Sequence, residues 1–417
     1  MSDTINQLII LGNGFDLECG LHSSFSDYYG TRQNNLEEWL KAESNGQESH
    51  NISVWDFIFA KEHENNPSWT DVESTIADWI CKLHGPKDLS QSQQDWLHKF
   101  INDNAKTLSE DDYNNWREKL DNSEELSLPS LQAQCFLSKS ENRYLSLDDF
   151  LFLQLKKLED GFEQYIQQEA QNTTYRSNTE KLFHLISRYD ENSKTMYSDS
   201  NMLLNNVLSF NYTRIQPSAT ISNTELGVWR NVHGTIGNHN IIFGIDSTQY
   251  PNYINNASVN QFTKTFRVLQ LESQRRDSDI FQSSKNGHPF HSIKFYGHGL
   301  GKADYSYFKS IFDYVELYSS QVQLLFFYPS DRPIERNHLF LRVSDLLNTY
   351  GNTMIDQKRG QNLLHKLILE NRLHIVELDT RALKNSKGNN TKSLSYRDEI
   401  VSAAFEKFQI KFNKEKN

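Results

Sequence analysis

The stretch QLIILGNGFD, residues 7–16, decides the expected fold. Its first half is a short, continuous apolar run, which is typical of a strand buried on both faces of a parallel sheet. Gly12 and Gly14 follow at once and permit a sharp turn, after which a helix is expected. A strand, a glycine-rich turn and a helix in this order indicate a nucleotide-binding α/β unit, because the free N–H groups of such a helix start attract phosphate.

The turn itself is an incomplete dinucleotide fingerprint. Leu17 stands where the pattern G-x-G-x-x-G needs its third glycine, and Gly20 comes too late to replace it. Two interpretations stay open: a phosphate-binding turn, or a tight strand-to-helix turn in which Asp16 caps the helix. The candidate nucleotide-binding residues of the turn are Gly12, Asn13, Gly14, Phe15 and Asp16.

Short apolar runs recur along the chain and set the expected fold class. They span residues 207–210, 240–245, 292–296, 322–328 and 373–378. Segments of helical periodicity lie between some of them, as the crossovers between parallel strands require. We therefore predict an α/β fold with a doubly wound, mostly parallel, Rossmann-like sheet.

Almost two hundred residues separate the first strand-like run from the second, which is too long for a single crossover. An amphipathic pattern from Ser146 to Ile166 predicts a helix within this separation. We predict a Rossmann-like nucleotide-binding core formed by residues 1–30 and 201–417, and a mainly helical inserted lobe formed by residues 31–200.

Composition indicates a folded protein for which nucleic acid is an unlikely partner, although a local basic groove stays open. Aromatic residues make up 12% of the 417, unlike in a disordered chain, and the net charge of -11 argues against a generally basic surface. The three cysteines are widely spaced and form neither a disulfide framework nor a zinc pattern, so no metal is expected. We see no signal peptide and no apolar run near the ~18 residues of a membrane span, so a cytoplasmic location is expected.

Two predicted strand ends carry polar side chains that suit ribose chemistry. One is the run Ser209-Phe210-Asn211-Tyr212-Thr213, in which Ser209 and Tyr212 flank Asn211, and the other is Val232-His233-Gly234. Asn211 offers donors and an acceptor to a ribose hydroxyl or an attacking water, and His233 is a base near neutrality. Each has an alternative role, because an Asn often bonds its own turn and a His before Gly is often a turn residue.

The run FYGHGLGKAD, residues 295–304, is the most unusual in the chain. An apolar strand leads into three alternate glycines, which let a loop wrap closely round a phosphate or a ribose. Lys302 suits phosphate and Asp304 suits ribose hydroxyls, whereas the alternative is a flexible loop in which Asp304 caps a helix. The candidate binding residues are Gly297, His298, Gly299, Lys302 and Asp304.

Asp71 and Glu73 form a weak candidate for a metal site. Residues two apart share a face only in a strand. Acids that complement the dipole of a helix start are the stronger interpretation. Together with His298 and Asp304, the pair defines a metal-dependent nuclease as one alternative function.

Taken in order, six runs resemble the AbiH family of bacterial abortive-infection proteins: GNGFD, WTDVE, SFNYT, VHG, IIFGID and FYGHGLGKAD. The resemblance extends from about residue 7 to residue 330, and its first and last runs are distinctive. It implies a role in phage defence with an unidentified phage trigger, and it supplies no reaction.

The same order is similar, more distantly, to sirtuin-like NAD-binding domains, including NAD-cleaving ones used in phage defence. This resemblance implies that Asn211 handles the nicotinamide ribose and its water, and that His233 is the catalytic histidine. It also implies that Gly12 and Gly14 form the phosphate turn, and that Gly297 and Gly299 lie near the adenosine.

The chain departs from the sirtuin-like pattern at two positions. Asp16 stands where a small residue or Ser is usual, and Thr213 replaces the Asp that usually follows Tyr212. The four-cysteine zinc site of the protein deacetylases is missing, so we reject deacetylation.

The leading hypothesis is hydrolysis of the nicotinamide–ribose bond of NAD, through an oxocarbenium-like state. Asn211 and His233 would be catalytic, and Asp16 or Asp304 would supply negative charge. The alternatives are a module that senses NAD, ADP-ribose or another nucleotide without turnover, and the nuclease. Because a resting effector must be restrained, a homo-oligomer is a further possibility.

Overall fold

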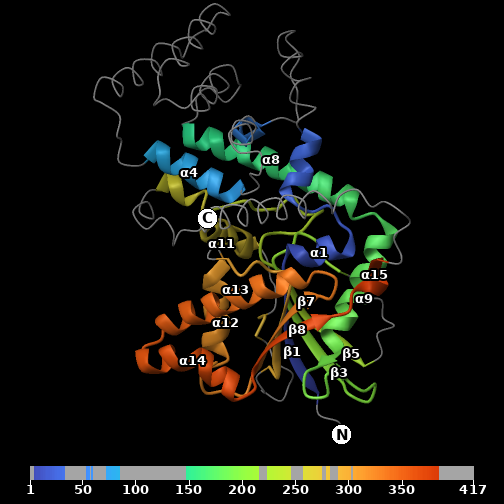
Figure 1. Cartoon of the computed structure of the whole chain (residues 1–417). Helices are drawn as coiled ribbons and strands as arrows, with labels where there is room; N and C mark the ends of the chain where they lie inside the picture. The colour runs from blue at the N-terminus through green and yellow to red at the C-terminus, as the bar shows by residue number, and fades with distance from the viewer. Residues whose placement is uncertain are drawn as a thin grey trace, which may run out of the picture.

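The computed structural model describes residues 4–32, 53–56, 58–59, 72–84, 147–215, 223–245, 257–274, 279–281, 290–301 and 304–384. These residues form an α/β fold in which helices cover both faces of a parallel sheet (Figure 1). Within them, no helix combines the length and the apolarity that crossing a membrane requires.

The centre of the fold is a six-stranded sheet with the order β5-β4-β1-β6-β7-β8, and neighbouring strands are parallel. Numbered along the chain, this is 3-2-1-4-5-6, the order of dinucleotide-binding folds, in which the winding reverses between β1 and β6. The predicted fold class is confirmed. The strands are β1 (Ile5–Leu11), β4 (Leu203–Ser209), β5 (Thr224–Asn231), β6 (Ser292–Tyr296), β7 (Gln323–Pro329) and β8 (Leu373–Leu378).

Residues 8–11 of β1 are continuously apolar because their side chains alternate between two hydrophobic cores. Ile9 and Leu11 belong to one cluster, and Leu8 and Ile10 belong to the other. None of the four is more than 1% exposed. Burying each such side chain contributes about 1.5–3 kcal/mol, so the run fixes β1 at the centre of the sheet.

Each core is completed by helices on one face of the sheet. On the first face, α1 (Asn13–Cys19) and α9 (Thr173–Arg188) pack against each other, and α9 also contacts β4 and β6. On the second face lie α12 (Tyr305–Tyr314) and α13 (Pro333–Asn352), and α13 pairs with α14 (Gln357–Leu369).

Further helices lie over the carboxyl end of the sheet, where α1 begins (Figure 1). They are α4 (Val72–His84), α8 (Leu147–Glu169), α10 (Ala257–Asn260) and α11 (Lys264–Gln274). α8 is the helix expected from residue 146. The division into core and inserted lobe stays a prediction, and α9, which it assigns to the lobe, packs on the sheet. Two short strands, β2 (Tyr189–Asp190) and β3 (Thr195–Met196), and α15 (Arg381–Lys384) are also described, as is a helix over residues 25–32.

One predicted strand is wrong. Residues 240–245 are apolar and mostly buried, but they form only an isolated bridge, from Ile245 to Thr263. The backbone N–H of Phe243 donates to the carboxylate of Glu159 on α8 (2.7 Å) instead of to a strand. The run is therefore a loop buried beneath α8, and its apolar residues reflect burial rather than strand pairing.

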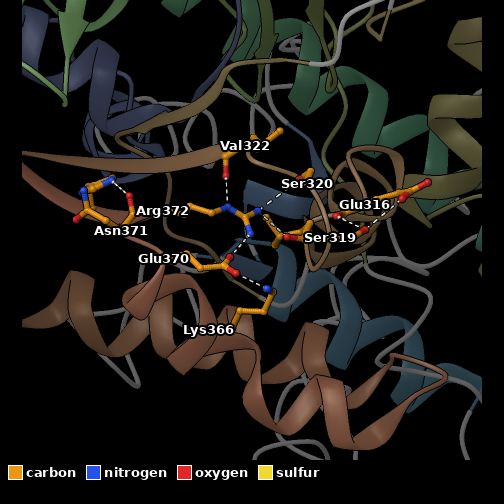
Figure 2. A network of polar contacts seen from close by, with 10 residues as sticks. Glu316, Ser319, Ser320, Val322, Lys366, Glu370, Asn371 and Arg372 are labelled. Atoms are coloured by element: carbon orange, nitrogen blue, oxygen red, sulfur yellow. Dashed lines mark hydrogen bonds and ion pairs between the residues drawn. The ribbon is translucent and has the colours of Figure 1, made fainter.

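The amino ends of β7 and β8 are fixed by a polar network around Arg372, far from the carboxyl end of the sheet (Figure 2). Arg372 is 2% exposed, and its guanidinium donates to the carbonyl groups of Val322 (3.0 Å) and Leu317 (2.6 Å). It also pairs with Glu370, which in turn contacts Lys366. These bonds satisfy loop carbonyls that precede β7, so the network has a structural role.

Candidate functional site

The carboxyl ends of β1, β4, β5 and β6 bring the predicted site residues together. Leu11 of β1 is in register with Ser209 of β4 and with Tyr296 of β6, and Ser209 is in register with Asn231 of β5. Because parallel strands end at one edge, the loops after these four strands meet there, at the position where open α/β sheets bind ligands.

The glycines after β1 are explained by contacts within the protein. A Cβ at Gly12 would lie 2.5 Å from the Cα of His298, and one at Gly14 would lie 2.7 Å from the Cα of Gly297. The N–H of Gly14 donates to the carbonyl of Gly297 (2.8 Å). The turn is thus pressed against the loop after β6, and its role in phosphate binding stays a prediction, as do those of Asn13 and Phe15.

Asp16 is a buried carboxylate and not a helix cap. Gly12 occupies the N-cap of α1, and Asp16 lies inside the helix with 2% of its surface exposed. Its oxygens accept hydrogen bonds from the hydroxyls of Tyr175 (2.9 Å) and Thr213 (2.8 Å). Burial raises the pKa of Asp16 to about 6, although hydrogen bonds from Thr213, Tyr175 and Asn211 act in the opposite direction.

Asn211 is 4% exposed, and its side-chain oxygen Oδ1 accepts no hydrogen bond from the described residues. Its backbone is held in place, because its N–H donates to Ser209 Oγ (3.2 Å) and its carbonyl accepts from Asn231 Nδ2 (2.7 Å). Asn231 also donates to the carbonyl of Thr213 (2.7 Å). Asn231 was not predicted from the sequence, where it has no motif of its own.

Asp304 lies between two histidines. Its Oδ2 is 3.4 Å from His298 Nε2, and its Oδ1 is 3.6 Å from His233 Nε2. His298 Nδ1 accepts a hydrogen bond from the N–H of Leu300 (2.9 Å), so the neutral ring carries its proton on Nε2, toward Asp304. Asp304 stands at the N-cap of α12, but its side chain makes no capping bond.

Charges within this cluster set the protonation states. Burial lowers the pKa of His233 to about 3, and the positive charge of Lys264 acts in the same direction, so His233 is neutral at pH 7. Burial acts to raise the pKa of Asp304, but the bond from His298 and the charge of Lys264 outweigh it and hold that pKa below its ordinary value.

Lys264 joins the cluster to α4. Its Nζ is 3.3 Å from Asp304 Oδ1 and 2.9 Å from Glu73 Oε2. Glu73 lies in the first turn of α4, where the sequence favoured a helix-start acid, and its pairing with Lys264 argues against a metal-binding role. Asp71 and Lys302 lie outside the described residues. Sequence analysis missed Lys264, because no local pattern distinguishes it.

Tyr212 anchors the loop beneath α8. Its hydroxyl donates to the carbonyl of Ile242 (3.3 Å), and its ring packs edge-on against Phe162 of α8 and against Phe243. Burial raises the pKa of this hydroxyl, and the negative charges of Glu73, Glu159 and Asp304 act in the same direction.

A cavity of about 290 Å³ lies beside this cluster, between the loop after β6 and the start of α13. Gly297, with φ +70°, turns the loop, and His298 and Gly299 also line the cavity. The helix α13 side of its wall carries the charged or titratable side chains of Arg332, Glu335, His338 and Arg342. Neither Asn211 nor His233 is among its lining residues.

The strand order and the polar loops at one edge define an α/β protein with a dinucleotide-type sheet. The chain belongs to the AbiH family, described as bacteriophage abortive infection AbiH, whose family model matches residues 8–328. No curated protein matches the sequence. Family membership confirms the resemblance to AbiH proteins and supports a role in abortive infection by bacteriophage.

Proposed function

We propose that this protein is an abortive-infection effector that binds NAD at the carboxyl edge of its sheet and hydrolyses the nicotinamide–ribose bond. The observation that carries the proposal is the buried carboxylate of Asp16 beside Asn211, an amide whose oxygen has no partner among the described residues. A buried polar atom without a partner is rare in folded proteins and calls for a functional explanation.

The chemistry of the bond suits these groups. Water adds to the ribose carbon, nicotinamide leaves, and one proton is released, through a state with positive charge on the sugar. A fixed carboxylate in a buried site stabilises such a charge more strongly than one in water. With a pKa of about 6, Asp16 is mostly ionised at pH 7 and can also take up the proton of the attacking water.

Asn211 and His233 have complementary roles in this scheme. The free Oδ1 of Asn211 is suited to accept a hydrogen bond from the attacking water. His233 is neutral, and its Nε2, 3.6 Å from Asp304 Oδ1, makes no hydrogen bond to the described residues, so it can bond a ribose hydroxyl. The negative charge of Asp304 and the positive charge of Lys264 both lie close to the ring of His233 and partly cancel there.

The cavity beside the cluster suits the anionic part of the substrate. Arg342 lies at its wall, together with Arg332, whose guanidinium already pairs with Glu18 and Glu335. Guanidinium groups bind phosphate through paired hydrogen bonds, so Arg342 is the main candidate to bind it. We therefore assign the diphosphate to this cavity in preference to the turn after β1, whose Gly14 N–H is already bonded to Gly297.

The test is the NAD content of infected cells that carry the protein. His233→Ala and Asn211→Ala are each expected to abolish NAD loss, because each removes a hydrogen bond that positions the ribose or the attacking water, and such a loss costs on the order of 10²-fold or more in rate. The exposed His22 provides a control variant, His22→Ala, which should behave as wild type. Unchanged NAD during a wild-type defence response would refute the proposal.

A nucleotide sensor without turnover is the second candidate. It is favoured by the burial of Asn211 and His233, which are 4% and 5% exposed, and by their absence from the wall of the cavity. Purified protein that binds NAD or ADP-ribose tightly and releases no nicotinamide would support this candidate over hydrolysis.

A further inference from the structure

We propose a divalent metal site between α8 and the turn that follows β5, formed by Asp160, Glu163 and His239. One potential ligand atom of each residue lies within 4.8 Å of those of the other two. The site is separate from the residues assigned to NAD, and the proposal does not depend on NAD hydrolysis.

Glu163 is the buried member of the three, with 1% of its surface exposed. Its Oε1 accepts hydrogen bonds from the N–H groups of Gly237 (2.6 Å) and His239 (3.1 Å). Its Oε2 is buried and has no partner among the described residues. A buried carboxylate oxygen is costly unless a charge or a donor compensates it, so this atom points to a missing cation.

The cations nearest to this site are engaged with another carboxylate. Arg267 and Lys156 pair with the neighbouring Glu159, and the charge of Lys156 also acts on Asp160. Within the described residues no donor reaches Glu163 Oε2. Two carboxylates that approach each other repel. A bound metal ion removes this repulsion and satisfies the free oxygen of Glu163.

The chemistry of the ligands indicates the class of metal. Asp160 and Glu163 are three positions apart on α8 and so share a face, and His239 approaches from the turn. An imidazole with two carboxylates suits Zn²⁺ and similar transition-metal ions better than Mg²⁺ or Ca²⁺, which favour all-oxygen ligands. Asp160 and His239 are exposed, so both side chains have room to close on the ion.

The proposed metal site lies on the turn that follows His233, so metal binding would affect the loop beside His233. The turn that carries His239 starts directly after His233 and closes on itself, with the N–H of Thr235 donating to Asn240 Oδ1 (2.7 Å). At present one carboxylate, Glu163, holds the turn to α8. A metal ion would add a second, stronger link, and metal supply would thereby control the order of the loop next to His233.

The test is calorimetric titration of the full, tag-free chain with Zn²⁺ and, separately, with Mg²⁺. Asp160→Asn and His239→Ala are the test variants, because both side chains are exposed and neither one holds the turn through the bonds above. His22→Ala is the matched control, since His22 Nδ1 also contacts a glutamate of α8, Glu169 (3.1 Å), without a third ligand in the described residues.

We expect one Zn²⁺ to bind per chain, with at least about tenfold weaker binding in each test variant and unchanged binding in the control. Zn²⁺ should also slow amide hydrogen exchange in residues 234–240 of the wild type only. Absence of saturable Zn²⁺ binding, Mg²⁺ binding as tight as Zn²⁺ binding, or binding that Asp160→Asn and His239→Ala leave unchanged would overturn the proposal. None of these readouts uses NAD, so they are independent of the proposed hydrolysis.

Discussion

The hydroxyl of Thr213 donates a hydrogen bond of 2.8 Å to the carboxylate of Asp16, although 197 positions separate the two residues. Asp16 lies on α1, after β1, and Thr213 lies in the loop after the neighbouring strand β4. The bond therefore joins the segments that follow two adjacent strands and holds a carboxylate at the edge of the sheet.

Asp16→Asn is expected to flatten the pH dependence of folding stability. Burial raises the pKa of Asp16 from 3.8 to about 6 in the folded protein, so the folded state retains a proton that the unfolded chain releases. The stability from this proton is complete below pH ~4 and is lost as the pH rises through 6. Between pH 4.5 and 7.5 the loss amounts to roughly 2 kcal/mol. Urea unfolding at both pH values measures it, and equal pH dependence in variant and wild type would contradict the assignment.

Thr213→Val is expected to destabilise the protein by about 1–3 kcal/mol at neutral pH, because a buried charged acceptor loses a donor. Thr213→Ser keeps the hydroxyl and should cost much less. The comparison is made by urea unfolding at pH 7.5. If both substitutions cost the same, the hydrogen bond to Asp16 is not what stabilises this contact.

Lys264→Met is expected to cost about 3–5 kcal/mol, since it removes a buried ammonium and leaves the partly buried Asp304 without this partner. The matched control is Lys309→Met, which breaks the exposed pair with Asp313 and should cost less than about 1 kcal/mol. Thermal unfolding distinguishes the two. If Lys309→Met were as destabilising as Lys264→Met, the ion pair between Lys264 and Asp304 would not be a major source of stability.

Gly360→Ala is expected to destabilise the pair of α13 and α14 by about 1–3 kcal/mol. A Cβ at Gly360 would lie 1.9 Å from the carbonyl oxygen of Gly351, so the helices would have to separate. At Gly30, in the helix of residues 25–32, a Cβ would meet nothing within 4 Å. Gly30→Ala should therefore be neutral or stabilising by up to ~1 kcal/mol. If both substitutions lowered the denaturant midpoint equally, the close contact between α13 and α14 at Gly360 would not be the cause of the destabilisation.

The sequence predicts most of the sheet, because buried parallel strands leave continuous apolar runs such as the one that forms β1. It fails at residues 240–245, where an equally apolar run lies beneath α8 without pairing as a strand. It also gives no bounds for β5, an edge strand whose residues are partly exposed. Local hydrophobicity indicates that a segment is buried. Only tertiary contacts decide whether a buried segment pairs with a strand of the sheet.

The candidate site follows from the sequence to a similar extent. The grouping of Asn211, His233 and Asp304 at one edge follows from the rule that parallel strands share a carboxyl end. Lys264 and Asn231 could not be found, because each acts through partners distant in sequence. The sequence also could not show why residue 12 must be a glycine, since a side chain there would collide with the loop after β6.

Release of nicotinamide from NAD by the purified protein, with and without phage lysate, tests the central claim most directly. We predict release by the wild type on activation and, for folded Asn211→Ala and His233→Ala proteins, rates lower by on the order of 10²-fold or more. Tight binding of NAD without any nicotinamide release, in the presence of lysate from a phage that triggers the defence, would contradict the claim.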